Sequence, residues 1–218
     1  MASRMFPFIT RTWNPLGGEC LHHCSYCWAR KLAERYGQKK YTGKPRIYAK
    51  VLEKGEFKRS DFVFVCDMTD LFGHWVPKEI IIAILRHIKR SSATFLLLTK
   101  NPERYLEFDI PSNCVCGATI ESDADHVLTG PPESLRLEAM KKLKHPRKMI
   151  AIEPVMDFSA NFIAQLIEVK PEFVAVGYDN YGCGLVEPPF WKVKALMDNL
   201  EVNGIKVYRK TMREAWDK

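Results

Sequence analysis

The chain has 218 residues, 46% of them hydrophobic, which is enough to bury one core, so we expect a single domain over residues 1–218. No apolar run approaches the length of a membrane span and the first residues hold no apolar signal segment, so we expect a soluble protein of the cytoplasm. Lysine and arginine number 33 against 26 acidic residues, and the net charge of +7 suits an anionic partner without identifying one. Seven cysteines, three of them clustered, favour a metal site in a reducing compartment over a disulfide framework.

Short apolar segments without polar alternation recur along the chain, as is typical of buried parallel strands, and segments with helical spacing lie between them. After a first strand that precedes Gly17, the chain order is a helix over 25–36, a strand over 62–66, a helix over 78–89, strands over 94–98 and 115–120, a helix over 133–143, a strand over 149–152, a helix over 158–168, a strand over 173–176, a helix over 189–200 and a strand over 205–208. Such repeated strand-helix units predict an α/β fold. A complete eight-unit barrel needs about 250 residues. We therefore expect a partial (β/α)6 TIM-like barrel of parallel strands with outer helices.

The least regular part of the chain is residues 37–60, which we interpret as a basic insertion after the first helix. Between Arg30 and Arg59 there are eleven basic and three acidic residues, a local net charge of +8. This segment accounts for the whole positive excess of the chain. It is the part of the surface where we expect nucleic-acid phosphates to bind.

Three cysteines, Cys20, Cys24 and Cys27, lie within one eight-residue stretch that follows two glycines. Thiolates are soft, anionic donors, and three of them can bind three corners of an iron–sulfur cube while the fourth iron stays open. The open iron could chelate the amino and carboxylate groups of S-adenosylmethionine (SAM). The same cysteines with His22 or His23 could instead close a Cys3His zinc site, which would make the chain a non-catalytic, zinc-stabilised basic binding module. Against zinc, no second ligand pair at finger spacing occurs elsewhere in the chain.

The cysteine spacing, with the aromatic Tyr26 before the third cysteine, resembles the signature of the radical-SAM superfamily. That resemblance implies a [4Fe-4S] cluster on the three cysteines, reductive cleavage of SAM to a 5′-deoxyadenosyl radical, Tyr26 near the adenine, and a reductant such as flavodoxin or ferredoxin. Further short segments are similar to the branch of spore photoproduct lyase and its uncharacterised phage-associated relatives. They are Thr69-Asp70, Leu98-Thr99-Lys100-Asn101, Ala118-Thr119-Ile120 with Glu121, and the Pro-Pro-x-x-x-x-Arg sequence that ends at Arg136.

Polar residues follow most of the predicted strands, and the carboxyl ends of parallel strands meet at one edge of the sheet. Lys100 is the best cation for the carboxylate of SAM, and Asp70, Glu121 and Glu153 could accept hydrogen bonds from its amine and ribose hydroxyls. The resemblance adds Thr69, Thr99 and Thr119 to this candidate SAM site. Each of the acids could instead cap the helix that follows it.

Cys66 is a candidate catalytic residue by the same resemblance. In spore photoproduct lyase a cysteine near the Thr-Asp element returns a hydrogen atom to the product radical. Cys66 precedes Thr69 by three positions, where two are expected, so packing in the core is the competing interpretation.

The substrate that we expect is a nucleic acid or nucleotide, modified or repaired by radical chemistry. The basic segment and the resemblance to a lesion-repair branch motivate this hypothesis, and Arg209-Lys210 at the end of the last strand could reach a phosphate. A radical-SAM enzyme that acts on a peptide or a small metabolite is the alternative.

Overall fold

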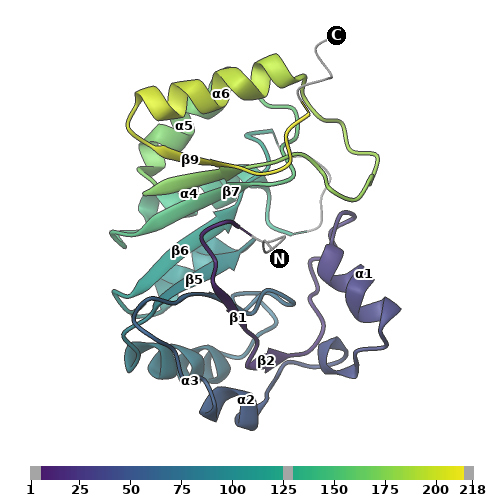
Figure 1. The fold of residues 1–218 in the computed structure, drawn as a ribbon, viewed down its shortest axis with the longest axis vertical. Helices are drawn as coiled ribbons and strands as arrows, with labels where there is room; N and C mark the ends of the chain where they lie inside the picture. Colours follow the sequence, from purple (N-terminus) through teal and green to yellow (C-terminus); the bar gives the residue numbers. More distant parts are fainter. Residues whose placement is uncertain (1–5, 125–129, 214–218) are drawn as a thin grey trace.

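Seven parallel strands form one curled sheet in the computed structural model, which describes residues 6–124 and 130–213. The strand order is β1 (Arg11–Trp13), β4 (Phe62–Val65), β5 (Thr94–Thr99), β6 (Cys114–Thr119), β7 (Lys148–Ile152), β8 (Phe173–Val176) and β9 (Lys206–Arg209). The sheet curves into a half-barrel with helices around it (Figure 1). The expected partial TIM-like α/β fold is confirmed.

Helices α3 (Lys78–Lys89), α4 (Glu133–Lys142), α5 (Phe162–Val169) and α6 (Phe190–Val202) cover the outer face of the sheet, and the short helix η2 (Pro102–Glu107) connects β5 to β6. Helix α1 (Trp28–Arg35) lies on the opposite side (Figure 1). Among the helices of the described residues, none is both long and apolar enough to cross a bilayer.

Two helices begin three or more residues later than their sequence patterns predict, and in each case a side chain explains the start. Cys27 is extended and its Sγ accepts a hydrogen bond from the backbone N–H of Arg30, so α1 begins at Trp28. Asp123 accepts a hydrogen bond of 2.8 Å from the backbone N–H of Ser159, which holds the chain before Phe162 outside the helix.

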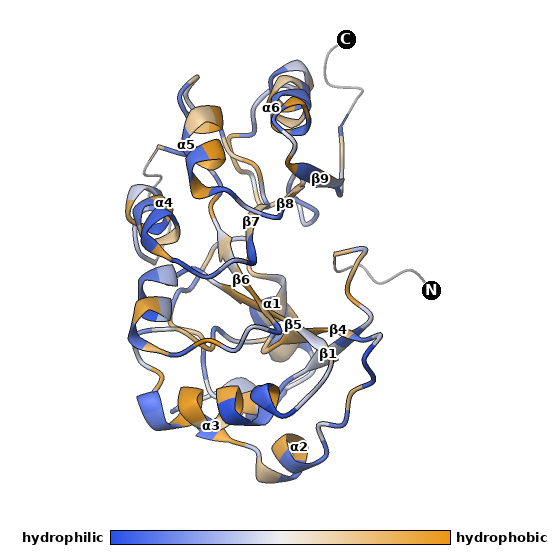
Figure 2. Ribbon diagram, turned by 90° about the vertical axis from the view of Figure 1, so that its left-hand side faces the viewer, coloured by the Kyte–Doolittle hydropathy of each residue, from blue (hydrophilic) through white to orange (hydrophobic). Residues whose placement is uncertain are grey.

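The larger core lies between the sheet and the outer helices. Helix α3 buries Ile81, Ile84, Leu85 and Ile88 there, at the spacing of one helical face. Figure 2 shows the hydrophobic residues of the strands in the interior and the mixed colouring of the outer helices. Apolar residues on both faces explain why the strands read as continuous apolar runs.

A second, smaller core fills the inner face of the half-barrel and includes the segment before β1. Phe8 packs against Phe62 of β4, Phe173 of β8 and Tyr208 of β9, with ring centroids 5.1, 4.8 and 4.7 Å away. Phe6 is buried beside Phe64. The N-terminal segment thus bridges strands near both edges of the open sheet from the inside.

The basic insertion contains short regular elements that its sequence does not predict: η1 (Lys39–Tyr41), β3 (Arg46–Ile47) and α2 (Ala49–Glu53). Strand β3 pairs with β2 (Leu16–Gly17) in a separate antiparallel ribbon. Gly18 has φ +110°, and a Cβ on it would lie 2.8 Å from the Cα of Pro45. Glycine is therefore required where the insertion packs on the chain that leads to Cys20.

Phe8→Ala is expected to lower the free energy of unfolding by roughly 2 to 3 kcal/mol, because it removes the ring that joins β4 to β8 and β9. Urea denaturation of the full-length chain measures the effect. Leu135→Ala, at an exposed position of α4, is the control and should change stability by less than about 0.5 kcal/mol. Equal effects of the two substitutions would contradict the proposed bridging role of Phe8.

Candidate active site

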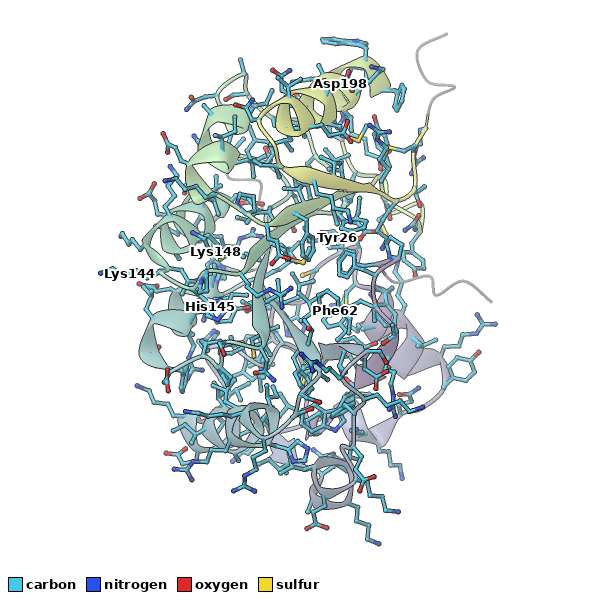
Figure 3. The ribbon with its side chains drawn as sticks, turned by 60° about the vertical axis from the view of Figure 1, so that its left-hand side comes forward. Tyr26, Phe62, Lys144, His145, Lys148 and Asp198 are labelled. Atoms are coloured by element: carbon cyan, nitrogen blue, oxygen red, sulfur yellow. The ribbon has the colours of Figure 1, made fainter. Side chains whose placement is uncertain are left out.

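A cavity of about 500 Å³ lies at the carboxyl ends of the strands, between the inner face of the sheet and the cysteine-bearing loop. Eleven of the twelve residues that the sequence predicts for the site line it; they are Cys20, Cys24, Tyr26, Cys27, Cys66, Thr69, Asp70, Thr99, Lys100, Thr119 and Glu153. The exception is Glu121, which is fully buried behind the cavity wall. Figure 3 shows Tyr26 in the interior of the molecule, between the N-terminal part of the chain and the strands. The predicted residues are thus brought together from five separate parts of the chain.

The three cysteines are free thiols at one side of this cavity, with Cys24 buried and Cys20 and Cys27 half-buried. The backbone N–H of Cys27 donates to the carbonyl of Cys24 at 3.1 Å, which forms a tight turn. Burial raises the pKa of the Cys20 thiol to about 12, so this thiol is neutral until a metal binds and displaces its proton.

The cysteines bear on both metal alternatives, which need different sets of ligands. A structural zinc site needs four ligands that converge on one ion. Within residues 6–124 and 130–213, no group of three or more His, Cys, Asp or Glu side chains converges in this way. The ligands of an iron–sulfur cube bind different irons, so three cysteines suffice for a cube whose fourth iron stays open.

Asp70 fastens the cysteine loop to the sheet. Its Oδ2 accepts hydrogen bonds from Nε2 of His22 at 2.8 Å, Oγ1 of Thr99 at 2.8 Å and the backbone N–H of Lys100 at 2.9 Å. Oδ1 accepts from the backbone N–H of Phe72 at 2.9 Å. Burial opposes ionisation of this carboxyl, but the hydrogen bond from His22 and the others outweigh burial and lower the pKa of Asp70. His22 is therefore hydrogen-bonded to the carboxylate of Asp70, which anchors the cysteine loop.

Glu121 is the second buried anchor. It accepts hydrogen bonds from the hydroxyl of Tyr26 and from Nζ of Lys100, and its Oε2 accepts from Nη1 of Arg136 at 2.6 Å. Burial opposes ionisation, but Lys100 and Arg136 outweigh it and lower the pKa of Glu121 to about 2. Glu133, buried beside them, lies 3.1 Å from Nη2 of Arg136. Two cations and two carboxylates therefore balance in this cluster.

At the other end of the cavity, Glu153 forms an ion pair of 2.6 Å with Lys210, and Nδ2 of Asn180 lies 3.4 Å from Glu153. Burial raises the pKa of Glu153, although Lys210 opposes that effect. Arg209 turns away from the cavity and pairs with Glu201 on the surface at 3.0 Å. Of the two bases at the end of β9, only Lys210 lines the cavity.

Cys66 combines two features. It belongs to the larger core and it also lines the cavity, with 4% of its surface exposed. Its φ of +58° lies in the left-handed region, where residues other than glycine are uncommon. Burial raises the pKa of this thiol to about 12, so it is held as S–H.

The basic insertion does not reach the cavity. None of residues 33–59, all of which the structure describes, lines it. Three tryptophans lie in different surroundings: Trp28 lines the cavity, Trp13 belongs to the larger core and Trp75 packs edge-on against His22 at 4.8 Å.

Sequence patterns miss several residues that shape the site. The role of His22 as a loop anchor depends on Asp70, 48 positions away, and no local spacing reveals such a pair. Phe6 forms part of the cavity floor from a segment that carries no strand or helix pattern.

Comparison with solved structures finds the same fold in spore photoproduct lyase. A variant of that enzyme with bound AdoMet and dinucleoside spore photoproduct matches with a TM-score of 0.62 and 11% sequence identity, over 97% of this chain and 80% of the other. A second variant matches with a TM-score of 0.61 and 9% identity, over 93% and 76%. Identities this low establish the fold alone.

No curated protein matches the sequence. The model of one protein family, described as "Protein of unknown function (DUF5131)", matches residues 5–178. Because that match covers most of the chain, the protein belongs to the DUF5131 family, and its fold is that of the radical-SAM enzyme spore photoproduct lyase.

Proposed function

We propose that this protein is a radical-SAM enzyme of the cytoplasm that binds a [4Fe-4S] cluster through Cys20, Cys24 and Cys27. The observation that carries the proposal is the common cavity, which these cysteines line together with Lys100 at the ends of parallel strands. When bound, the reduced cluster supplies one electron for cleavage of SAM to a 5′-deoxyadenosyl radical.

Lys100 is suited to hold the carboxylate of SAM. Its ammonium group lies 4.8 Å from the centre of the Tyr26 ring, is bonded to Glu121 and still lines the cavity. An ammonium group has three donors, so the bond to Glu121 leaves others for a ligand. Glu121 and Asp70 support this contact, because they bind Lys100, Tyr26 and His22.

The charge of the cavity wall also suits SAM, which carries a net positive charge. Four carboxylates line the cavity, those of Asp67, Asp70, Glu153 and Asp179, against the two amines of Lys100 and Lys210. A sulfonium ion is favoured in such surroundings.

We further propose that the substrate is a nucleic acid or nucleotide. Support comes from the structurally similar lyase, whose complex contains a dinucleoside photoproduct. The basic insertion adds no support inside the cavity, because it contributes no residue to the wall. A peptide or small metabolite is the competing substrate class, and product analysis separates the two.

Replacing any one of Cys20, Cys24 and Cys27 by Ala is expected to abolish 5′-deoxyadenosine formation after anaerobic reconstitution, because a cube held by two thiolates is not retained. The wild-type chain should bind about four irons, and the circular dichroism of the three variants should stay close to it. Formation of 5′-deoxyadenosine by all three variants would refute the cluster assignment. A colourless wild-type protein that binds zinc instead would favour the non-catalytic binding module.

Glu121→Gln is expected to lower the stability of the cluster-free protein in a pH-dependent way. The folded-state pKa of about 2 lies below the ordinary 4.5, so the charge of Glu121 stabilises the fold fully above pH 4.5, and this contribution is lost as the pH falls towards 2. The stability difference between wild type and variant should therefore shrink by roughly 1 kcal/mol between pH 7 and pH 3.5, as measured by urea denaturation. A difference that does not change with pH would contradict the buried, ionised Glu121.

Cys66 is proposed as the hydrogen-atom donor, because its buried S–H lines the cavity. Its S–H bond breaks, a C–H bond forms on the substrate radical, and the unpaired electron remains on sulfur. In deuterium oxide the thiol exchanges, so wild type acting on total DNA and RNA should leave deuterium in the nucleosides, and Cys66→Ala should not. Label introduced by Cys66→Ala would exclude this donor. If the wild type forms 5′-deoxyadenosine but leaves no deuterium in the nucleosides, the result would favour a peptide or small metabolite as the substrate.

A further inference from the structure

The basic insertion presents a set of cations without acidic partners. Here "the basic face" means its exposed residues Lys39, Lys44, Lys50, Lys54, Lys58 and Arg59. Among the described residues, none of these six side chains forms an ion pair with an acid. Figure 1 shows the segment running from the end of α1 to α2, beside β2. Exposed, unpaired charges gathered in one segment produce a field that attracts an acidic partner.

This segment is a folded structure, which distinguishes the basic face from a loose charged loop. Arg46 donates hydrogen bonds to the carbonyls of Thr42 and Lys39, each at 2.9 Å, and to the hydroxyl of Tyr48 at 3.0 Å. Lys40 lies over the Tyr48 ring at 4.8 Å. Arg46 and Lys40 build the segment, and the exposed lysines are left for binding.

The segment that carries the basic face is hydrogen-bonded to the chain just before the cysteines. The backbone N–H of Gly18 donates to the carbonyl of Lys40, and that of Glu19 donates to the carbonyl of Gly43, both at 2.9 Å. Cys20 is the next residue after Glu19. The segment therefore packs on the outside of the chain that leads into the proposed cluster site.

A ligand on the basic face would be separated from the interior of the cavity. Residues 33–59 do not line the cavity, and carboxylates outnumber amines along its wall. A phosphate backbone bound outside would find no continuous positive path to the proposed reaction site. Delivery of an electron has no such requirement, since the donor only has to approach the cluster from outside.

The surface of the cysteine loop also suits such an approach. Leu21, between the first two cysteines, is 43% exposed, and the neighbouring His22 and Cys24 are buried. Complexes between electron-transfer proteins bury little area and use complementary charge to raise the association rate. An apolar contact at Leu21, two residues after the Glu19 that bonds to the basic insertion, has this character.

We propose that the basic face, with Leu21, is the docking surface for an acidic one-electron carrier protein. One electron passes from the reduced carrier, which is oxidised by one electron, to the cluster, which is reduced by one; no bond is made or broken and no proton moves. The inference rests on the proposed radical-SAM function. A nucleic acid is the other macromolecule that the charge could attract, and the experiment distinguishes it.

The test compares two double variants with the same change of charge. Lys39→Glu with Lys44→Glu alters the basic face, and Lys142→Glu with Lys144→Glu alters exposed lysines near the end of α4. Figure 3 shows Lys144 on the far side of the molecule from the N-terminal part of the chain. The reconstituted proteins are assayed for 5′-deoxyadenosine with reduced flavodoxin, an acidic carrier, and separately with dithionite, a small reductant that needs no docking surface.

With flavodoxin at low salt, the basic-face variant should be slower than wild type by about tenfold or more, and the control variant should stay within about twofold. High salt should reduce the difference. With dithionite all three proteins should be equally active, which shows that fold and cluster are intact.

An unchanged flavodoxin rate in the basic-face variant overturns the inference. If the same variant also loses its salt-dependent binding to DNA or RNA, the basic face binds a nucleic acid instead of the carrier. Failure of the proposed function looks different: wild type would form no 5′-deoxyadenosine with either reductant.

Discussion

Two buried carboxylates, Asp70 and Glu121, determine the shape of the site. Asp70 binds His22 from the stretch between the first two cysteines, and Glu121 binds Tyr26 from the stretch between the last two. Both carboxylates also contact Lys100, one through its backbone N–H and the other through its ammonium group. Buried charges are tolerated only with such partners, so the cysteine loop, the end of β5 and the start of α4 are held in one arrangement.

The parallel sheet supplies the frame for these contacts. Because neighbouring strands run in the same direction, Cys66, Lys100, Glu121 and Glu153 all come directly or shortly after the ends of strands at one edge. The apolar segments of both cores pack the two faces of the sheet, and Phe6 and Phe8 fill the inner face below the cavity. The cysteine loop, which has little apolar content of its own, is ordered by the carboxylates above the frame.

Much of this frame is predictable from the sequence. The strands lie within one residue of the predicted positions, because uninterrupted apolar runs mark strands that are buried on both faces. The late start of α5 and the small elements of the insertion are not predictable, since they depend on Asp123 and on contacts with β2. Pairing between distant segments leaves no trace in local spacing.

The candidate site shows the same division. Residues at strand ends reach the cavity because the topology brings them there, and only Glu121 differs, being enclosed by Tyr26, Lys100 and Arg136. The sequence identifies an acid at the end of a strand but not the side to which it turns. The orientation of Lys210 towards Glu153 and of Arg209 towards Glu201 is likewise decided by tertiary contacts.

The central claim is that the three cysteines hold a cluster with SAM bound at its open iron. Electron paramagnetic resonance of the anaerobically reconstituted, reduced protein tests it most directly, with spectra recorded before and after addition of SAM. The account predicts the signal of a reduced [4Fe-4S] cluster that changes when SAM is added, since the ligand binds to the cluster itself. A protein without a cluster signal, or a signal that SAM leaves unchanged, would contradict it.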